Sequence, residues 1–392
     1  MGKPQLRSLS TRESIKSGPV YRIERDGTLT SKPEVTALEV AQAAGATPIL
    51  LEVRLPNGEL FNLLGPSGGA KNLEKQYRAR EQQGDPYATN VFFQPGAAGP
   101  LIGLANRLTG WKVRPGVLEA RVLDIPICAP VNHGHGPGQI PHHLHGVGFD
   151  KPTQISIQSD HHGIQIRGDF EPGFHQPFWC GSFSARAMHS LHDGLYEFDL
   201  QIKNEGKTEI PMGAGAHPYF WAVSQDPDAI AIRVPGHKIV EIDNYENVLP
   251  TGRLLDLEPG SDLDFSAPEG RLLKDLYLDN IWVDLETNPE GFAFVEFLDR
   301  AAGVGFRMTA TTKNIRGVQV FSPRPTDFPE LGVFASLELV TNLPDPRDEL
   351  WQEIPTGMVR LQSGESLRYG YRIEPFEIPV TNSQRTSSAN RF

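Results

Sequence analysis

The sequence has 392 residues, a formal net charge of −11 and two cysteines, Cys128 and Cys180. The acidic balance, without any run rich in lysine or arginine, excludes a polyanionic partner such as nucleic acid, because binding to phosphates requires a basic surface. Two cysteines exclude a disulfide framework and are typical of free thiols in a reducing compartment. The 39 glycines and 33 prolines disfavour long helices, so we expect many short strands joined by turns.

The first segment of the chain is expected to be an extension. Residues 1–36 are polar and lack apolar periodicity, so we expect them to be partly ordered at best. They also lack the apolar segment of a secretory signal, and no run of about 18 apolar residues predicts a membrane span. Together these features favour a cytoplasmic protein without a membrane partner.

Strand patterns begin after this extension. Asn57-Gly58 is a strong two-residue turn between two alternating segments. Residues 195–202 alternate and then meet the turn-rich segment 204–207, where we expect a hairpin to the next strand. Segments 292–297 and 304–308 predict another hairpin.

No linker divides the chain, so we expect one domain over residues 37–377, followed by a disordered polar tail at 378–392. Many strands without intervening helical patterns predict an all-β sandwich or barrel. Periodicity alone does not distinguish these two architectures.

The segment 215–221 (Gly-Ala-His-Pro-Tyr-Phe-Trp) is a candidate active site. Pro218 restricts the backbone of His217 toward extended geometry. Tyr219 offers a flat apolar face of the kind that stacks on a sugar ring. A histidine beside such a face can carry a proton near neutral pH. Taken alone, a core histidine at a strand end is the more common interpretation.

Other short motifs accompany this segment, in one order along the chain. They are Gly45-Ala46-Thr47, Asn106-Arg107, Leu144-His145-Gly146, Gly148 to Lys151, His217 to Phe220, Leu249 to Gly252, Asp279-Asn280, Gly317 to Phe321, Leu337-Glu338 and Ser363 to Leu367. With these motifs in this order over residues 37–375, the sequence resembles the aldose 1-epimerase (galactose mutarotase-like) family. The resemblance implies that family's large antiparallel β-sandwich.

The resemblance also implies that Glu338 and His217 are the catalytic residues. Interconversion of α and β aldoses requires a base at the anomeric hydroxyl and an acid at the ring oxygen, and we expect them on opposite sides of the bound ring. Glu338 takes the role of base and His217 the role of acid. Alternation in residues 335–341 puts Leu337 and Leu339 on one face of a strand and Glu338 on the other.

A further polar set is implied to hold the sugar hydroxyls. Arg107 offers a rigid fork of donors, and Asp279 can accept hydrogen bonds from two neighbouring hydroxyls. The full expected substrate-binding set is Asn106, Arg107, His145, Asp279 and Tyr219.

Two positions depart from the usual pattern of the family. Leu339 follows the glutamate where proline is usual, and Trp221 stands where asparagine is usual. Both are expected near the sugar. Trp221, Trp282 and Phe149 are also candidates for stacking on the ring, although large aromatic residues are more often part of a core.

Ten of the twelve histidines lie between His133 and His192. His143 and His145 would share a face of an extended strand, as metal ligands can, but no glutamate follows until Glu171. Histidines in a segment rich in glycine and proline are usually solvated. We therefore expect exposed loop histidines, no metal and no cofactor, since mutarotation needs only proton transfers.

The expected function is therefore that of an isomerase that interconverts the anomers of a hexose, with a small-molecule sugar as its partner. Three alternatives stay open: a non-catalytic carbohydrate-binding or sensor protein on the same scaffold, a hexose-6-phosphate 1-epimerase, and a metal-dependent sugar isomerase or oxygenase that uses the segment His142 to His145. No arginine cluster suited to a phosphate is apparent, which slightly favours a free sugar. The oligomeric state is left open.

Overall fold

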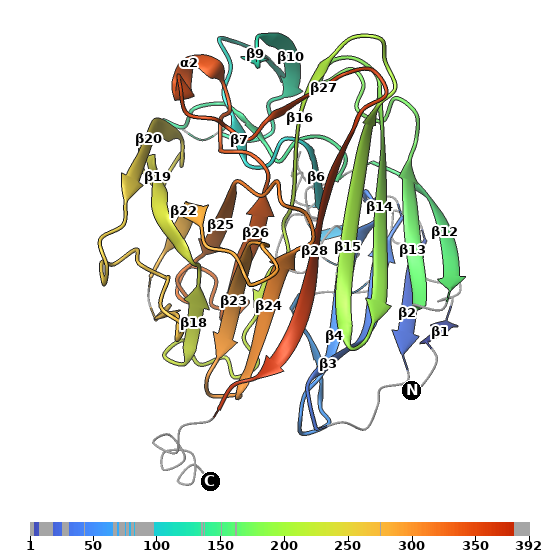
Figure 1. Ribbon diagram of the computed structural model, residues 1–392, viewed down its shortest axis with the longest axis vertical. Helices are drawn as coiled ribbons and strands as arrows, with labels where there is room; N and C mark the ends of the chain where they lie inside the picture. Colours follow the sequence, from blue (N-terminus) through green and yellow to red (C-terminus); the bar gives the residue numbers. More distant parts are fainter. Residues whose placement is uncertain are drawn as a thin grey trace.

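The computed structural model has an all-β architecture with antiparallel sheets and a short helix, α2 (Asp348–Trp351) (Figure 1). The residues that it describes are 4–7, 19–25, 31–42, 44–65, 69, 75, 78–79, 82, 98–134, 136, 138–149, 151–160, 163–274 and 276–379. The expected fold class is confirmed. Within the described residues, no helix is long and apolar enough to cross a membrane. Most of the expected tail, 378–392, lies outside them.

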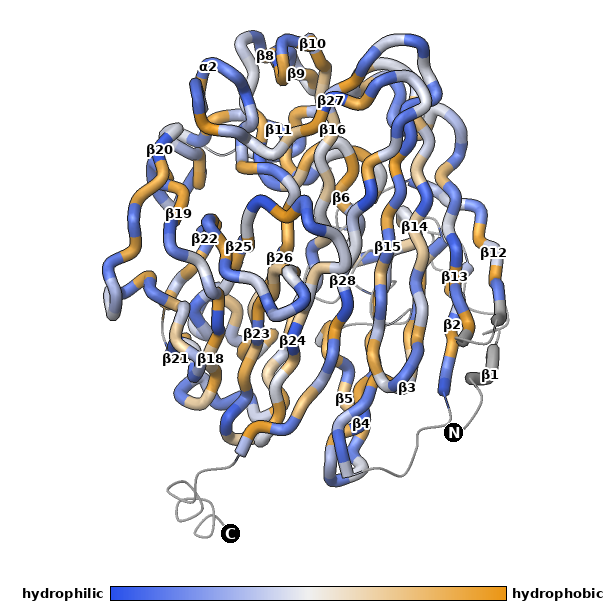
Figure 2. Tube along the Cα trace, in the orientation of Figure 1, coloured by the Kyte–Doolittle hydropathy of each residue, from blue (hydrophilic) through white to orange (hydrophobic). Residues whose placement is uncertain are grey.

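A first large sheet has nine strands within the described part of the chain. Their spatial order is β12 (Thr153–Asp160), β13 (Gly163–Phe170), β14 (Phe183–His192), β15 (Leu195–Asn204), β28 (Ser366–Glu377), β24 (Val304–Ala310), β23 (Phe294–Asp299), β18 (Ile230–Arg233) and β21 (Arg271–Leu272). Along β13, β14 and β15, apolar and polar residues alternate (Figure 2). This period of two is what a sheet with one solvated face requires.

The second large sheet also has nine strands in the described residues. Seven form a path in the order β20 (Pro250–Asp256), β19 (Gly236–Ile242), β22 (Leu278–Leu285), β25 (Gly317–Ser322), β26 (Phe334–Val340), β16 (Ile210–Ala216) and β27 (Val359–Leu361). The short strand β17 (Tyr219–Trp221) pairs with β26, and β6 (Pro100–Gly103) pairs with β16.

Smaller sheets complete the structure. A five-stranded sheet contains β1 (Pro4–Arg7), β2 (Val20–Arg25), β3 (Glu34–Ala41), β4 (Thr47–Arg54) and β5 (Leu60–Asn62). A three-stranded sheet contains β8 (Lys112–Arg114), β9 (Val117–Val122) and β10 (Ile125–Pro130), and β7 (Arg107–Leu108) pairs with β11 (His143–Leu144). Strand β3 contacts β14, β15 and β28, so the five-stranded sheet packs against the first large sheet.

The two large sheets bury the main core between them. Leu337 and Leu339 of β26 are fully buried in the same hydrophobic cluster as Tyr369 and Tyr371 of β28. Tyr369 Oη also donates a hydrogen bond to the carbonyl oxygen of Leu339 at 2.8 Å, which links the sheets directly. The predicted alternation in β26 is therefore confirmed, and Glu338 faces away from this core.

Two of the three expected hairpins are confirmed. The Asn57-Gly58 turn lies between the paired strands β4 and β5, with Gly58 at a positive φ of 86°, which glycine adopts without strain. Strands β23 and β24 pair across the turn at 300–303.

The hairpin expected at 204–207 is wrong, because the chain crosses from one large sheet to the other at this point. Strand β15 pairs with β14 and β28, whereas the following strand, β16, pairs with β6, β26 and β27. Asn204 Nδ2 fixes the crossing by donating to the carbonyl oxygens of Thr208 and Leu361, at 2.8 and 2.9 Å.

Candidate active site

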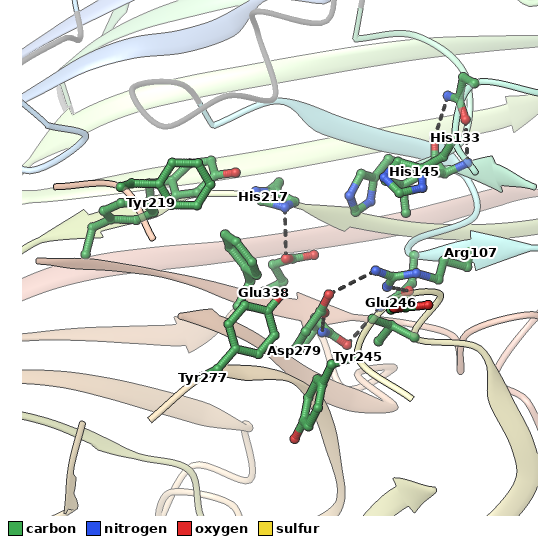
Figure 3. Close-up of a pocket in the computed structure, with 18 of the residues that line it drawn as sticks. Arg107, His133, His145, His217, Tyr219, Tyr245, Glu246, Tyr277, Asp279 and Glu338 are labelled. Atoms are coloured by element: carbon green, nitrogen blue, oxygen red, sulfur yellow. Dashed lines mark hydrogen bonds and ion pairs between the residues drawn. The ribbon is translucent and has the colours of Figure 1, made fainter. Parts of the chain in front are cut away.

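A cavity of about 410 Å³ lies on the face of the second sheet that is opposite Leu337 and Leu339. Strands β22, β25 and β26 contribute to its wall, and loops from other parts of the chain complete it (Figure 3). All seven residues that the sequence predicts for the site line this cavity: Asn106, Arg107, His145, His217, Tyr219, Asp279 and Glu338. Residues separated by more than 200 positions thus meet in one place.

His217 and Glu338 form a buried pair in the wall of this cavity. His217 Nε2 lies 3.1 Å from Glu338 Oε1, and the two side chains are 7% and 1% exposed. His217 occupies the link between β16 and β17, and both of these strands pair with β26, which carries Glu338. The expected placement on opposite sides of a sugar is therefore wrong: the acid and the base lie side by side.

Burial controls the charge of this pair. Desolvation, with a further contribution from Asp279, raises the pKa of Glu338 well above its usual value. Desolvation lowers the pKa of His217 to about 4. Because the two pKa shifts are opposite in sign, the pair holds one exchangeable proton between Nε2 and Oε1. The neutral form and the ion-pair form differ only in the position of that proton.

Four polar side chains form a closed ring of hydrogen bonds beside the pair. Arg107 donates from Nη1 to Asn106 Oδ1 and from Nη2 to Asp279 Oδ2, both at 2.9 Å. Gln319 Nε2 donates to Asp279 Oδ1 at 2.6 Å, and Asn106 Nδ2 donates to Gln319 Oε1 at 2.8 Å. All four residues are buried. Because each member has two partners, the ring fixes the orientation of both amides and of the guanidinium.

Gln319 is a site residue that the sequence analysis missed. It lines the cavity and lies directly opposite Glu338 in the register of β25 and β26. A signal was present, because Val318 and Val320 flank it with the alternation of a half-buried strand. That pattern predicts that Gln319 faces away from the core, but only the strand register shows that it shares the face of Glu338.

Among the buried polar atoms of the site, Arg107 Nε, a donor, and Glu338 Oε2, an acceptor, have no hydrogen-bond partner in the described residues. Buried polar atoms are costly when they are unpaired, at about 1–3 kcal/mol each. A cavity wall with such atoms, next to fixed carboxylate and amide groups, is suited to a small molecule that carries several hydroxyl groups.

The backbone at Asn106 and His145 is strained where these residues meet. Both have positive φ angles, 68° and 69°, and His145 N donates to the carbonyl oxygen of Asn106 at 2.8 Å. Asn132 holds the adjacent Leu144 through two hydrogen bonds, at 2.7 and 2.9 Å. The His145 ring then lies edge-on to that of His217, with 4.8 Å between centroids. Such strain in residues other than glycine is concentrated at functional sites.

Three histidines of the segment 133–145 are not solvated as expected, while His135 lies outside the described residues. His142, His143 and His145 are all buried, because β11 pairs with β7 and turns this segment inward. Desolvation lowers the pKa of His142 and of His143 to about 4, and that of His145 well below its usual value. His145 is therefore neutral at pH 7 and can donate to or accept from a hydroxyl.

The expected strand face shared by His143 and His145 is also absent from the described structure, since β11 ends at Leu144 and His145 adopts a left-handed backbone. His143 Nδ1 is instead within 2.9 Å of the carbonyl oxygen of Pro130. Across the described ranges, no group of three or more histidine, cysteine, aspartate or glutamate residues is placed to hold a metal ion.

The aromatic residues divide between wall and core. Tyr219 and Phe149 line the cavity, and the Tyr219 ring lies 4.8 Å from that of His217. Trp221 and Trp282 are fully buried and are not part of the cavity wall; Trp221 stacks on Phe334 at 4.6 Å. Further aromatic residues of the wall were not anticipated, namely Tyr245, Tyr277, Phe321, Phe328 and Phe334.

The two positions that depart from the family pattern have different surroundings. Leu339 packs between the large sheets, and Trp221 Nε1 donates to the carbonyl oxygen of Leu331 at 2.7 Å. Leu339 faces away from the cavity, so its expected place near the sugar is wrong, whereas Trp221 packs directly behind the wall, against Tyr219 and Phe334.

Comparison with known proteins identifies the family of the chain. The aldose 1-epimerase family profile matches residues 113–374, more than half of the chain. The chain therefore belongs to the aldose 1-epimerase family. The match includes His145, His217, Asp279 and Glu338, whereas Asn106 and Arg107 precede it. A search of curated proteins gave no match.

Solved structures show the same fold at low sequence identity. A galactose mutarotase-like protein from Clostridium acetobutylicum has a TM-score of 0.69 at 12% identity, covering 96% of this chain and 99% of that one. Galactose 1-epimerase from Lactobacillus acidophilus has a TM-score of 0.61 at 14% identity, covering 97% and 100%. An aldose epimerase homologue from C. elegans has a TM-score of 0.63 at 13% identity, covering 88% and 97%.

Proposed function

We propose that the protein interconverts the α and β anomers of a free hexose by acid–base opening of the sugar ring. The observation that carries this proposal is the 3.1 Å contact between His217 Nε2 and Glu338 Oε1 in the wall of the cavity. A protein that only binds sugar does not need a buried histidine and glutamate that share a proton. Membership of the aldose 1-epimerase family supports the same chemistry.

In the proposed reaction, the ion-pair form of the two residues starts the cycle. Glu338 takes the proton of the anomeric hydroxyl while His217 delivers its Nε2 proton to the ring oxygen. Both oxygens are bonded to the anomeric carbon, so an acid and a base that lie side by side can act on them together. The open-chain aldehyde then rotates and recloses on its other face, with both protons returning. The pair gains or loses no net proton over the cycle.

The remaining wall residues are proposed to hold the hydroxyl groups. Asp279 is an acceptor, Arg107 a donor, and the neutral imidazole of His145 can be either. The hydrogen-bonded ring that includes Asn106 keeps Arg107 and Asp279 oriented without a bound sugar, so little ordering of these two groups is required on binding. Tyr219 presents an aromatic surface close to His217.

The charge of the cavity supports a free sugar over a hexose 6-phosphate. Among the described residues that line it, Arg107 is the only lysine or arginine, and Asp279 already neutralises it. Glu246 adds a further carboxylate to the wall. A phosphate would therefore meet carboxylates without an unpaired cation to receive it.

Polarimetry tests the proposal directly. Freshly dissolved α anomers of several aldoses and of hexose 6-phosphates are followed with and without the protein, and Glu338→Gln serves as the matched inactive control. We expect faster mutarotation of at least one free hexose. Binding of sugars by calorimetry without any acceleration would instead indicate a carbohydrate-binding protein, and acceleration restricted to the phosphates would indicate a hexose-6-phosphate 1-epimerase.

A further inference from the structure

A third polar side chain touches both members of the His217–Glu338 pair. Ser336 precedes Glu338 by two residues on β26 and is fully buried on the same face of the strand. Its Oγ lies 3.1 Å from His217 Nδ1 and 3.3 Å from Glu338 Oε1. It also donates to the carbonyl oxygen of Pro218 at 3.1 Å. One hydroxyl thus contacts the acid, the base and the backbone that carries the acid.

Ser336 is not placed to react with a substrate. It does not belong to the cavity wall, although His217 and Glu338 do. In addition, its hydroxyl faces Nδ1 of the imidazole, whereas Nε2 is the nitrogen in contact with Glu338. A role as a nucleophile would require access to the cavity, so the contacts point to a role that acts through His217.

The donors and acceptors around Ser336 Oγ determine which ring nitrogen of His217 carries a proton. Ser336 Oγ is a donor both to the carbonyl oxygen of Pro218 and to Glu338 Oε1, so its single proton is directed to one of these two acceptors. The lone pairs of Oγ then remain for a donor, and His217 Nδ1 can supply one only if it is protonated. The contact between Nε2 and Oε1 likewise needs a proton on one of these two atoms, but either atom can carry it.

We propose that Ser336 is a positioning residue that fixes the Nδ1–H tautomer of His217, so that Nε2 is the ring nitrogen that exchanges a proton with the sugar. In both forms of the pair, Nδ1–H donates to Ser336 Oγ. Only the proton at Nε2 moves. The hydrogen bond at one nitrogen of an imidazole determines the role of the other nitrogen. The kinetic consequence of this assignment rests on the proposed anomer interconversion, whereas the tautomer itself does not.

Nitrogen NMR of histidine-labelled protein reads the tautomer without any substrate. The signals of His217 are assigned as those missing from His217→Asn. We expect neutral His217 to be protonated at Nδ1 in the wild type and to shift toward the Nε2–H form in Ser336→Ala. The matched control is Ser322→Ala, because Ser322 is also buried and bonds only to the backbone, at the carbonyl oxygen of Phe334. A wild-type Nε2–H tautomer, or an unchanged tautomer in Ser336→Ala, would overturn the proposal.

Kinetics supply the second readout. In Ser336→Ala the Nδ1–H of His217 loses its contact with the Ser336 hydroxyl, so we expect kcat to fall by ~10–100-fold, in line with the cost of a lost buried hydrogen bond. KM should stay close to the wild-type value, since Ser336 does not line the cavity. Ser336→Cys keeps a weaker donor and acceptor in a similar volume and should recover part of kcat. It also provides the test if the alanine variant does not fold.

The two proposals fail in different ways. If the wild type turns over no aldose, the proposed function is wrong, and the NMR tautomer still decides the role of Ser336. If the wild type is active and Ser336→Ala keeps the kcat of Ser322→Ala, the positioning role is wrong while the proposed function stands.

Discussion

Two pairs of adjacent strands, one pair in each large sheet, show how this fold separates the structural scaffold from the candidate active site. Along β14 and β15, buried residues alternate with partly exposed ones, as Figure 2 shows by the alternation of hydropathy. Along β25 and β26 nearly every residue is buried, including the polar ones. Both pairs have the same antiparallel geometry and one apolar face toward the core. They differ only in what covers the other face.

On β14 and β15 that other face is in contact with solvent, so a polar residue there costs little. On β25 and β26 it lies beneath the cavity and its loops, so Gln319, Ser336 and Glu338 are removed from water. Burial of a polar group is unfavourable unless it is paired. Each of these three side chains accordingly has a hydrogen-bond or ion-pair partner within the site. The contrast suggests that polar residues on a doubly covered strand mark the site, while similar residues on β15 do not.

The largest expected effect comes from replacing a glutamate by glutamine on the covered face of β26, compared with the same replacement on the solvated face of β15. Glu338→Gln keeps the size of the side chain but removes the proton acceptor, so we expect kcat to fall by ~10²–10⁴-fold with little change in KM. Glu197→Gln on β15 should leave both constants unchanged, because Glu197 pairs with His192 at the partly exposed face, away from the cavity. Mutarotation is followed by polarimetry. Turnover close to wild type in Glu338→Gln would remove Glu338 from the reaction.

A smaller effect is expected from breaking the hydrogen-bonded ring. Gln319→Ala leaves Asp279 Oδ1 and Asn106 Nδ2 without their partner, at a cost of about 1–3 kcal/mol. Because these groups are proposed to hold hydroxyls, we expect KM to rise by about 10-fold while kcat changes little. Gln201→Ala on β15 is the matched control, since that side chain has only a long contact with Ser366. Equal kinetics in the two variants would show that the ring has no role in binding.

These strand pairs also show which parts of the fold and of the candidate site can be predicted from the sequence. Alternation around Glu338 and the Asn57-Gly58 turn are local signals, and both predictions are confirmed. The partners of Glu338 are not local, because Gln319 joins it only through the register of β25 and β26. The buried histidines of 133–145 depend in the same way on pairing between β7 and β11, which are more than 30 residues apart. Composition therefore predicts exposed histidines at positions that the tertiary structure buries.

Two histidines of β14 extend the comparison to stability. His189 faces the core, and desolvation lowers its pKa to about 3, whereas the hydrogen bond that the half-exposed His192 donates to the Glu197 carboxylate raises the pKa of His192. As the pH falls, His189 is protonated in the unfolded chain before it is protonated in the folded protein. Its contribution to the free energy of unfolding is therefore fully present above pH 6.5 and decreases below that pH. The loss is about 1.4 kcal/mol per pH unit, or about 2 kcal/mol between pH 6.5 and 5.

Urea unfolding at pH 7 and pH 5 measures this difference. We expect His189→Gln to lose about 2 kcal/mol less than the wild type between the two pH values, whatever its stability at pH 7. His192→Gln should change the pH dependence in the opposite direction, because the raised pKa of His192 stabilises the fold more as the pH falls. The same pH dependence in His189→Gln and the wild type would contradict the burial of a neutral His189.

The smallest expected effect is the change in kcat when the pH is lowered from 7 to 5. The pair stays in its one-proton state until a second proton adds to His217, and desolvation places that pKa at about 4. Arg107, Asp279, His145, Tyr219 and Glu338 face His217 in the site, and Arg107 further lowers the pKa. At pH 5 the active state is therefore still dominant, and kcat should remain within about twofold of its value at pH 7. With a histidine in contact with solvent, whose ordinary pKa is near 6.5, kcat would instead fall by about 30-fold over the same interval.

Initial rates at pH 5 and 7, with folding verified by circular dichroism at each pH, distinguish a buried His217 from a solvated one. A loss near 30-fold would mean that His217 is accessible to water during turnover, and that the covered face of β26 opens before the sugar reacts.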